Sequence, residues 1–506
     1  MESALGLHVG TENLCCALTR QTNGISQSSV IPNESGDRTT PIYASFRSNE
    51  TAFGLAAKHG LYRQLKYTVF RLIDFINGST SFELAANEVK CGLSQSTNEV
   101  ATFEVNLDGA KKSFPVNELF KSFLLIIFKY IEEVHSSATK NTVIACSDSL
   151  SLVQKTSLVK ICQGAGFNVL RVVSEMSVSI LPYGFLQDKS STFHIACVKV
   201  GAYKTTLCVY YIVGGMAARC FTCINEAIGG NQITWSFTND LALEFKRQSK
   251  LNVAESPRSL AKLFEQADNC KHILSTINTS SIAIDSLYEG FDFQTNVSRA
   301  KLENSAQKIF GEITSFIVDN FRKHDFAIEN IDKLLCIGGS MKMPKLQSIV
   351  SALFSNAKVL NSYTSDEISA IGASQQAFLL SKQSIKRNGP LVLTEKHCSI
   401  NVLPFSVLFR LNDEELFAIP PNSPLLLKEQ RDFPVNDKSF TVRFFAKHAL
   451  KEVLLKEFVL NEVNLELNIV ISFRISPDGA ADIKISQKQS DISISGYIEN
   501  IFEVQF

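Results

Sequence analysis

The sequence has no excess of positive or negative charge and no long apolar segment. Lys and Arg total 50 and are balanced by 50 Asp and Glu in a chain of 506 residues, so nothing in its overall charge attracts nucleic acid or an anionic membrane. The most apolar segment, 120–131, contains Lys121 and Lys129 and is too short to span a bilayer. The N-terminus, Met-Glu-Ser-Ala-Leu, lacks the basic region and apolar run of a secretory signal. We therefore expect a cytosolic protein with no membrane partner and no direct, sequence-specific nucleic-acid partner.

Several common site motifs are missing as well. No GxxxxGKS/T phosphate loop is present, and no GxGxxG motif opens a βαβ unit. Of the 12 cysteines, Cys220 and Cys223 have metal or redox spacing, but they lie in a strand-like stretch where residues three apart point to opposite faces. No second CxxC or nearby HxxxH completes a zinc set. We expect reduced, structural cysteines and no metal site.

The chain is too long for one compact core, and its pattern changes near residue 385. Residues 4 to about 385 alternate strand-like runs with amphipathic helices, which is typical of an α/β domain. Clear helical segments are 116–134, 151–164, 259–277, 301–324 and 345–354. Beyond the Gly389-Pro390 turn, apolar residues alternate with period two. We predict an α/β domain over 1–385, a linker over 386–394 and a small all-β domain over 395–506.

Two glycine hairpins repeat within the predicted α/β domain. "LHVGTENLCCAL" (7–18) superimposes without a gap on "VKVGAYKTTLCV" (198–209), so that Gly10 falls on Gly201 and His8 on Lys199. A third glycine turn, Gly338-Gly339, follows an apolar strand and precedes a helix that begins at Pro344. Glycine lets the backbone approach an anion closely, although a single glycine turn usually only turns the chain. Together the three turns predict two lobes that hold one nucleotide between them.

Several strings resemble those of one superfamily. They are "NESGDRTTP" (33–41), "GFNVLRVVSE" (166–175), "IDSLYEGFDF" (284–293) and "GGSMKMPKLQ" (338–347). With the duplicated hairpins they resemble the actin, sugar kinase and heat-shock chaperone superfamily, and within it the seventy-kilodalton heat-shock chaperone family. "FRISPDGAADIKIS" (473–486) is similar to the last strands of that family's peptide-binding sandwich. The resemblance implies an actin-like ATPase domain followed by a β-sandwich, with ATP or ADP as the ligand.

The resemblance also implies a nucleotide site. Asp268 and Lys342 stand where the family has a glutamate and an arginine, which should weaken the grip on the adenosine. Taken alone, Lys271 and Ser275 could be surface residues of a helix, and Glu175 and Asp366 could be helix caps. The residues that match the family's nucleotide site are Gly10, Thr11, Glu12, Gly201, Ala202, Lys204, Gly229, Gly230, Asp268, Lys271, Ser275, Gly338, Gly339, Ser340, Lys342 and Asp366.

The catalytic positions depart from the family pattern. His8 and Lys199 replace the two aspartates that organise Mg²⁺ in the family, and Ile73 replaces the lysine that positions water, while Glu175 matches the family's glutamate. Mg²⁺ prefers oxygen ligands, so histidine and lysine are poor substitutes. We expect no intact catalytic set and no conventional Mg²⁺ site. Either Lys199 and Lys204 act as fixed cations that let nucleotide bind without normal hydrolysis, which we favour, or the pocket is vestigial and both lysines are solvated.

The C-terminal part of the chain bears on the function that we expect. The chain ends at Phe506 without the helical lid of typical family members, so we expect any bound peptide to leave quickly. The chain resembles lidless cytosolic members of the family. This resemblance implies a J-domain partner in a ribosome-associated complex that assists nascent or unfolded polypeptides. We therefore expect an ATP-binding chaperone or co-chaperone with slow or absent hydrolysis. The alternatives are a pseudo-ATPase scaffold without a nucleotide cycle and a small-molecule kinase of the same superfamily.

Overall fold

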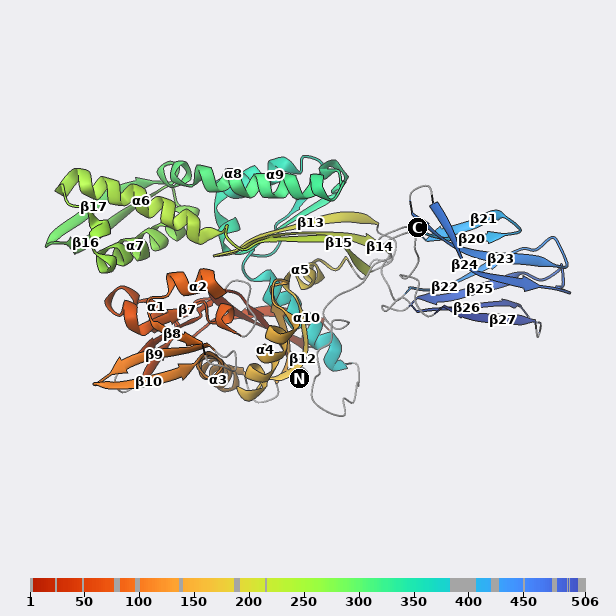
Figure 1. Cartoon of the computed structure of the whole chain (residues 1–506), viewed down its shortest axis with the longest axis horizontal. Helices are drawn as coiled ribbons and strands as arrows, with labels where there is room; N and C mark the ends of the chain where they lie inside the picture. Colours follow the sequence, from red (N-terminus) through yellow and green to blue (C-terminus); the bar gives the residue numbers. More distant parts are fainter. Residues whose placement is uncertain are drawn as a thin grey trace. The chain divides into compact units, whose positions relative to one another are not determined.

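The described residues form two compact units. The computed structural model describes residues 3–22, 25–47, 50–76, 82–95, 101–135, 140–185, 192–213, 216–382, 406–419, 427–448, 451–475, 480–488, 490 and 492–498. One unit is built mainly from the residues up to 382 and the other mainly from those after 405 (Figure 1). The predicted linker, 386–394, lies outside the described residues, so the three predicted boundaries remain predictions. Within the described ranges, no helix is long and apolar enough to cross a membrane.

The first sheet of the larger unit mixes antiparallel and parallel strands. Its strands lie in the order β12-β11-β1-β2-β3, and β4 (Thr40–Pro41) pairs with β2. The hairpin partners β1 and β2 are antiparallel, whereas β1 pairs in parallel with β11 and β11 in parallel with β12. The strand bounds are β1 Ser3–Val9, β2 Asn13–Thr22, β3 Ile25–Ile31, β11 Asn141–Cys146 and β12 Asn168–Ser174.

A second sheet repeats this plan. Its order is β15-β14-β13-β18-β19, and β13 pairs in parallel with β18, as β18 does with β19. Strand β13 thus corresponds to β1 and β14 to β2, which confirms the duplication predicted from the hairpins. We call 3–185 together with helix α10 the first lobe, and 192–360 the second lobe. The bounds are β13 Phe193–Val200, β14 Thr205–Val213, β15 Met216–Asn225, β18 Lys333–Ile337 and β19 Lys358–Leu360.

Helices and small sheets complete the two lobes, and the predicted helical segments are confirmed to within a few residues at their ends. Helix α4, for example, begins after a capping box in which the Ser151 hydroxyl and the Gln154 amide satisfy each other's backbone groups. The helices are α1 Leu55–Lys58, α2 Phe82–Glu88, α3 Val116–His135, α4 Leu152–Gly164, α5 Glu175–Val178, α6 Gly230–Ser249, α7 Pro257–Thr276, α8 Arg299–Lys323, α9 Pro344–Leu353 and α10 Ile368–Lys382. The short 3-10 helices are η1 Leu61–Arg63, η2 Leu65–Tyr67, η3 Leu72–Phe75, η4 Leu181–Tyr183, η5 Val253–Glu255, η6 Ile328–Asn330 and η7 Gly339–Lys342. The remaining strands are β5 Tyr43–Phe46, β6 Thr51–Phe53, β7 Thr68–Phe70, β8 Gly92–Gln95, β9 Ala101–Leu107, β10 Ala110–Pro115, β16 Thr279–Tyr288 and β17 Phe291–Ser298.

Helix α10 lies against the first sheet with no spare room. A Cβ atom built on Gly6 of β1 would lie 2.2 Å from the backbone nitrogen of Ser374 in α10. A Cβ on Gly372 of α10 would lie 1.9 Å from the carbonyl oxygen of Val178 in α5. Both distances are far inside van der Waals contact, so only glycine allows this approach.

The smaller unit is a β-sandwich, as the period-two pattern predicts. One sheet has the order β21-β20-β23-β24 and the other β22-β25-β26-β27. Its core is aromatic: the ring of Phe409 lies with its centroid 4.0 Å from that of Phe417, 4.4 Å from Phe444 and 4.8 Å from Phe473, which belongs to the opposite sheet. The strands are β20 Ser406–Leu411, β21 Glu414–Ile419, β22 Leu427–Phe433, β23 Phe440–His448, β24 Lys451–Leu460, β25 Ile469–Ile475, β26 Ala481–Gln487 and β27 Ser493–Ile498.

The packing of α10 predicts opposite effects for the same substitution in two helices. Gly372→Ala should lower the thermal unfolding temperature, because its methyl group would displace the backbone at Val178. Gly311→Ala in α8, where a Cβ would meet no atom within 4 Å, should stabilise the helix by about 1 kcal/mol, since alanine is the better helix former. Thermal denaturation followed by circular dichroism measures both. A Gly372→Ala protein at least as stable as the wild type would contradict the close packing.

Candidate functional site

The two glycine hairpins turn in the same way. The Gly10 amide donates a hydrogen bond to the carbonyl oxygen of Asn13 at 3.0 Å, and the Gly201 amide donates to that of Lys204 at 2.9 Å. These four residues occupy matching positions in the sequence echo. The start of α6 lies against the second turn, because the Gly230 amide donates to the Gly201 carbonyl at 2.9 Å. A Cβ on Gly229 would lie 2.7 Å from the Ala202 carbonyl oxygen, so a larger residue there would push α6 away.

Two adjoining cavities collect the predicted site residues. The larger, about 260 Å³, opens between the two hairpins, and the smaller, about 110 Å³, reaches α7 and the start of α6. Gly229 lines neither cavity but holds the start of α6 in place. Predicted residues that line the larger cavity are His8, Gly10, Thr11, Glu12, Ile73, Glu175, Lys199, Gly201, Ala202, Lys204, Gly338, Gly339, Lys342 and Asp366. Those that line the smaller one are Glu12, Ala202, Gly230, Asp268, Lys271, Ser275, Gly339 and Ser340.

The carboxylate of Glu175 is almost completely buried beside the larger cavity. The residue is 1% exposed, and one of its oxygens accepts hydrogen bonds from His8 Nε2 at 2.8 Å and is paired with Lys199 Nζ at 2.5 Å. Burial alone would raise the pKa of Glu175, but the Lys199 ammonium and the His8 ring together lower this pKa to about 2. Glu175 is the first residue of α5, and the N-cap of this helix is Ser174. The Glu175 side chain therefore lines the cavity and does not cap the helix.

Lys204 is held in the same manner. Its ammonium group donates to the Ser149 hydroxyl at 3.1 Å and to the Glu226 carboxylate at 3.2 Å, and lies 3.5 Å from an oxygen of Asp74. The residue is 8% exposed. The alternative in which Lys199 and Lys204 are simply solvated is therefore wrong. Lys199 is half-buried and Lys204 is buried, and in this structure both ammonium groups are paired with carboxylates of the chain itself.

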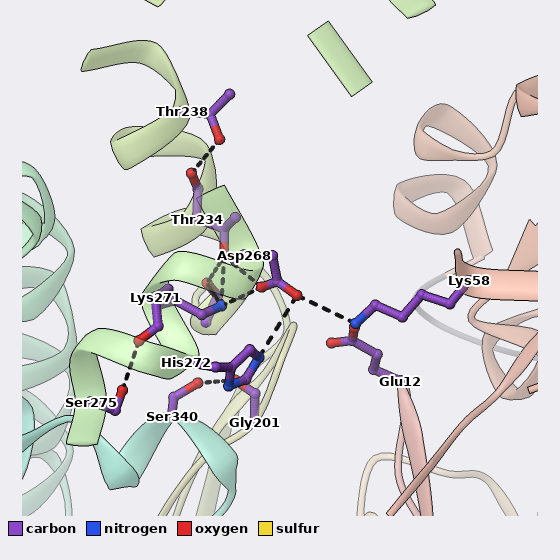
Figure 2. Close-up of polar contacts among 11 residues, drawn as sticks. Glu12, Lys58, Gly201, Thr234, Thr238, Asp268, Lys271, His272, Ser275 and Ser340 are labelled. Carbon is purple, nitrogen blue, oxygen red and sulfur yellow. Dashed lines mark hydrogen bonds and ion pairs between the residues drawn. The ribbon is translucent and has the colours of Figure 1, made fainter. Parts of the chain in front are cut away.

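The smaller cavity has its own buried carboxylate (Figure 2). Asp268 on α7 accepts hydrogen bonds from Lys271 at 2.8 Å and from Thr234 at 3.1 Å, and Lys58 binds it at 3.3 Å. Lys58 on α1 also binds Glu12 at 3.1 Å, so it bridges the first hairpin and α7. Burial would raise the pKa of Asp268, but Lys271 first, followed by its other cationic neighbours, holds it well below its ordinary value.

Four other predicted residues have partners close by. The Ser275 hydroxyl donates to the carbonyl of Lys271 at 2.9 Å, within its own helix. Ser340 donates to the Gly201 carbonyl at 3.1 Å and so ties the third glycine turn to the second hairpin. Lys342 pairs with Asp366 at 2.6 Å. Asp366 precedes α10, which begins at Ile368, and this ion pair lines the larger cavity.

Several cavity residues were not predicted. His272 lines both cavities and lies 3.7 Å from Asp268, four residues earlier on α7, a spacing that could have been noticed in the sequence. Lys58 and Asp74 lie in no recognisable motif. Arg71, 2% exposed, binds Asp74 at 2.8 Å and lies over the ring of Tyr203 at 4.1 Å from its centroid.

Comparison with known proteins identifies the family. The family model described as Hsp70 protein matches residues 4–500. The chain belongs to the Hsp70 family. This confirms the resemblance read from the sequence and the actin-like ATPase fold with a C-terminal all-β region, and it weighs against a small-molecule kinase. The chain is similar to several vertebrate Hsp70-family proteins, each named heat shock 70 kDa protein 14.

These relatives match most of the chain at modest identity. The protein of Danio rerio is 27% identical over 513 residues, which cover 98% of this chain and 99% of that protein. The protein of Mus musculus is 32% identical over 437 residues, covering 85% of this chain and 84% of the relative. That of Homo sapiens is 32% identical over 385 residues, covering 75% and 74%. The chain is thus a chaperone-family protein along nearly its whole length.

The residues between the hairpins do not fit a divalent metal. Among the described residues, no group of three or more His, Cys, Asp or Glu is arranged to hold a metal ion. The carboxylate of Glu175 already binds the His8 ring and the Lys199 ammonium group, and this ammonium group would repel Mg²⁺. A nucleotide fits better, because the turns at Gly10, Gly201 and Gly338 line the cavity with backbone.

One further carboxyl group lines the smaller cavity. Glu265 on α7 has a buried side-chain oxygen, Oε2, that finds no hydrogen-bond partner in the part of the chain that the structure describes. Burial raises its pKa from 4.5 to about 7, with Asp268 adding to the rise and Lys58 and Arg63 opposing it. The folded protein therefore holds this proton in a pH range in which the unfolded chain releases it.

The pairing of Glu175 with Lys199 predicts strong coupling between them. Glu175→Gln and Lys199→Met should each lower the free energy of unfolding by about 3–5 kcal/mol. Glu175→Gln leaves the Lys199 ammonium group without its carboxylate, and Lys199→Met leaves the buried Glu175 carboxylate with the His8 ring alone. The double variant should lose less than the sum of the two. Urea unfolding followed by the fluorescence of Trp235, the chain's single tryptophan, measures the second lobe. Strictly additive losses would show that the pair is not coupled.

Glu265 predicts a pH-dependent stability. Because its folded-state pKa lies above the unfolded value, stability should fall as pH rises from about 4.5 through 7. Glu265→Gln removes this proton release and should raise the unfolding temperature relative to wild type more at pH 8 than at pH 5. Differential scanning calorimetry across that range tests it, with the exposed Glu329→Gln as the control. Parallel pH profiles for wild type and Glu265→Gln would refute the effect.

Proposed function

We propose that this Hsp70-family protein is an atypical chaperone that binds ATP or ADP between its two lobes and hydrolyses it slowly or not at all. We further propose that it acts in the cytosol on nascent or unfolded polypeptides, with a J-domain partner at the ribosome. The observation that carries the proposal is the burial of Glu175 between His8 and Lys199. Lys199 and His8 stand at the positions that match the family's metal-organising aspartates. Gly10, Gly201 and Gly338 still line the cavity, although Ala202 and Tyr203 replace two glycines of the second turn.

The residues for nucleotide binding divide between the two cavities. Gly10, Gly201 and Lys204 would face the phosphates, and Asp268 and Lys271 the sugar. Hydrolysis needs a positioned water molecule and a cation that stabilises the charge on the leaving oxygen. A bound nucleotide would bring neither of these, only the charge of its phosphates. Ile73, which lines the larger cavity at 3% exposure, can position no water. These features support binding with little or no turnover.

The β-sandwich supports a role in polypeptide binding. Family sandwiches take extended apolar segments by main-chain pairing, and an edge strand offers unpaired backbone groups for it. Strand β24 lies at the end of its sheet in the described structure and exposes Leu454 and Val459, 49% each. A J-domain partner and ribosome association rest on the family resemblance alone.

Thermal denaturation with nucleotide tests the nucleotide site. Saturating ADP or ATP should raise the unfolding temperature by several degrees, equally with Mg²⁺ and with a chelator, because the site supplies its own cations. No shift in either condition would contradict nucleotide binding. A shift that requires Mg²⁺ would contradict the metal-free site.

The competing function is a pseudo-ATPase scaffold, and one observation favours it. Asp268 and Lys271, which would hold the sugar, already bind each other and Thr234. Single-turnover hydrolysis with and without a J-domain protein separates the two. Turnover stimulated by the J-domain protein would rule out the scaffold, whereas an absence of both turnover and nucleotide binding would establish it.

A further inference from the structure

The ammonium group of Lys204 lies where the two lobes meet. Lys204 follows the second hairpin turn, in the second lobe, and Glu226, its partner at 3.2 Å, belongs to the same lobe. Its other two neighbours, Ser149 at 3.1 Å and Asp74 at 3.5 Å, belong to the first lobe. One lysine side chain therefore connects oxygen atoms of both lobes.

The carboxylates around Lys204 are firmly placed. Asp74 in η3 is fully buried and is fixed by Arg71, whose guanidinium lies over the ring of Tyr203 in the second hairpin. Glu226 lies between β15 and α6 and does not line the cavity, whereas Lys204 does. The Lys204 ammonium group thus lies near the carboxylates of Glu226 and Asp74 and at the wall of the larger cavity.

A buried ammonium group needs a negative partner. In the structure the negative partners of Lys204 are Glu226 and Asp74. A phosphate group in the larger cavity would form a charge-assisted hydrogen bond with the same ammonium. It would have to draw Lys204 away from carboxylates that already neutralise it.

We infer that Lys204 is a built-in cross-link that holds the two lobes together without nucleotide, and that Glu226 competes with a nucleotide phosphate for its ammonium group. The competition rests on the proposed nucleotide binding, whereas the cross-link does not. Lys58, which joins Glu12 to Asp268, is a second bridge at the smaller cavity, so the lobes are tied at two places. A nucleotide that enters between the hairpins would have to rearrange these two bridges.

Hydrogen–deuterium exchange of the nucleotide-free full chain tests the cross-link. Lys204→Met keeps the length and bulk of the side chain and removes its charge, so backbone amides of η3 and of the first turn of α6 should exchange faster. Lys301→Met is the matched control, because it removes an ion pair with Glu244 that lies within the second lobe. Unchanged exchange at η3 in Lys204→Met, or an equal increase there in Lys301→Met, would overturn the cross-link.

Glu226→Gln tests the competition with a milder change that leaves Lys204 in place. Without the carboxylate, the dissociation constant for ADP in the presence of a chelator should fall about fivefold, the equivalent of about 1 kcal/mol for a partly exposed ion pair. Glu244→Gln should leave this constant unchanged. Calorimetric titration of the full chain measures it. A constant that is unchanged or larger in Glu226→Gln would overturn the competition.

The two experiments also separate this inference from the proposed function. If neither the wild type nor Glu226→Gln binds ADP or ATP, both nucleotide binding and the competition are overturned, while the exchange measurement still decides the cross-link. If the wild type binds nucleotide but both variants behave like their controls, the proposed function stands and the role of Lys204 does not.

Discussion

A carboxylate buried at the meeting point of two lobes must be neutralised, and Glu175 is such a carboxylate. Taking a charge out of water is costly unless an opposite charge comes with it. In this chain the opposite charge is the Lys199 ammonium group near the end of β13, and the His8 ring near the end of the corresponding strand β1 donates a hydrogen bond. The duplicated hairpins therefore meet at this carboxylate.

The same arrangement recurs along the cavities. Asp74 and Glu226 face Lys204, and Asp268 faces Lys58 and Lys271. Glu175, Asp74, Glu226 and Asp268 thus each have a lysine partner within the chain. The glycines at the turns, Gly10, Gly201 and Gly338, leave backbone atoms accessible to the cavity.

The sequence could reveal the parts of this site that are local, and not the pairs that join distant segments. Gly10 and Gly201 were recognisable because each turn lies within one short string, and helix α3 because its apolar residues recur at helical spacing. The partner of Lys199 could not be read in the same way, since Glu175 lies on another element and only the fold brings the two side chains within 2.5 Å of each other. Lys204 and Asp74 are 130 positions apart, and neither lies in a motif that points to the other. His272 is the exception, because its four-residue spacing from Asp268 was visible.

The close packing of helix α10 restricts movement within the first lobe. The helix begins two residues after Asp366, at the larger cavity, and its 15 residues span about 22 Å to Lys382, the last described residue before the β-sandwich segment. Gly6 and Gly372 leave no clearance between this helix, strand β1 and α5. The helix therefore cannot slide along β1 or α5 without a backbone clash. We expect α10 and the strand that carries His8 to move together as one rigid body.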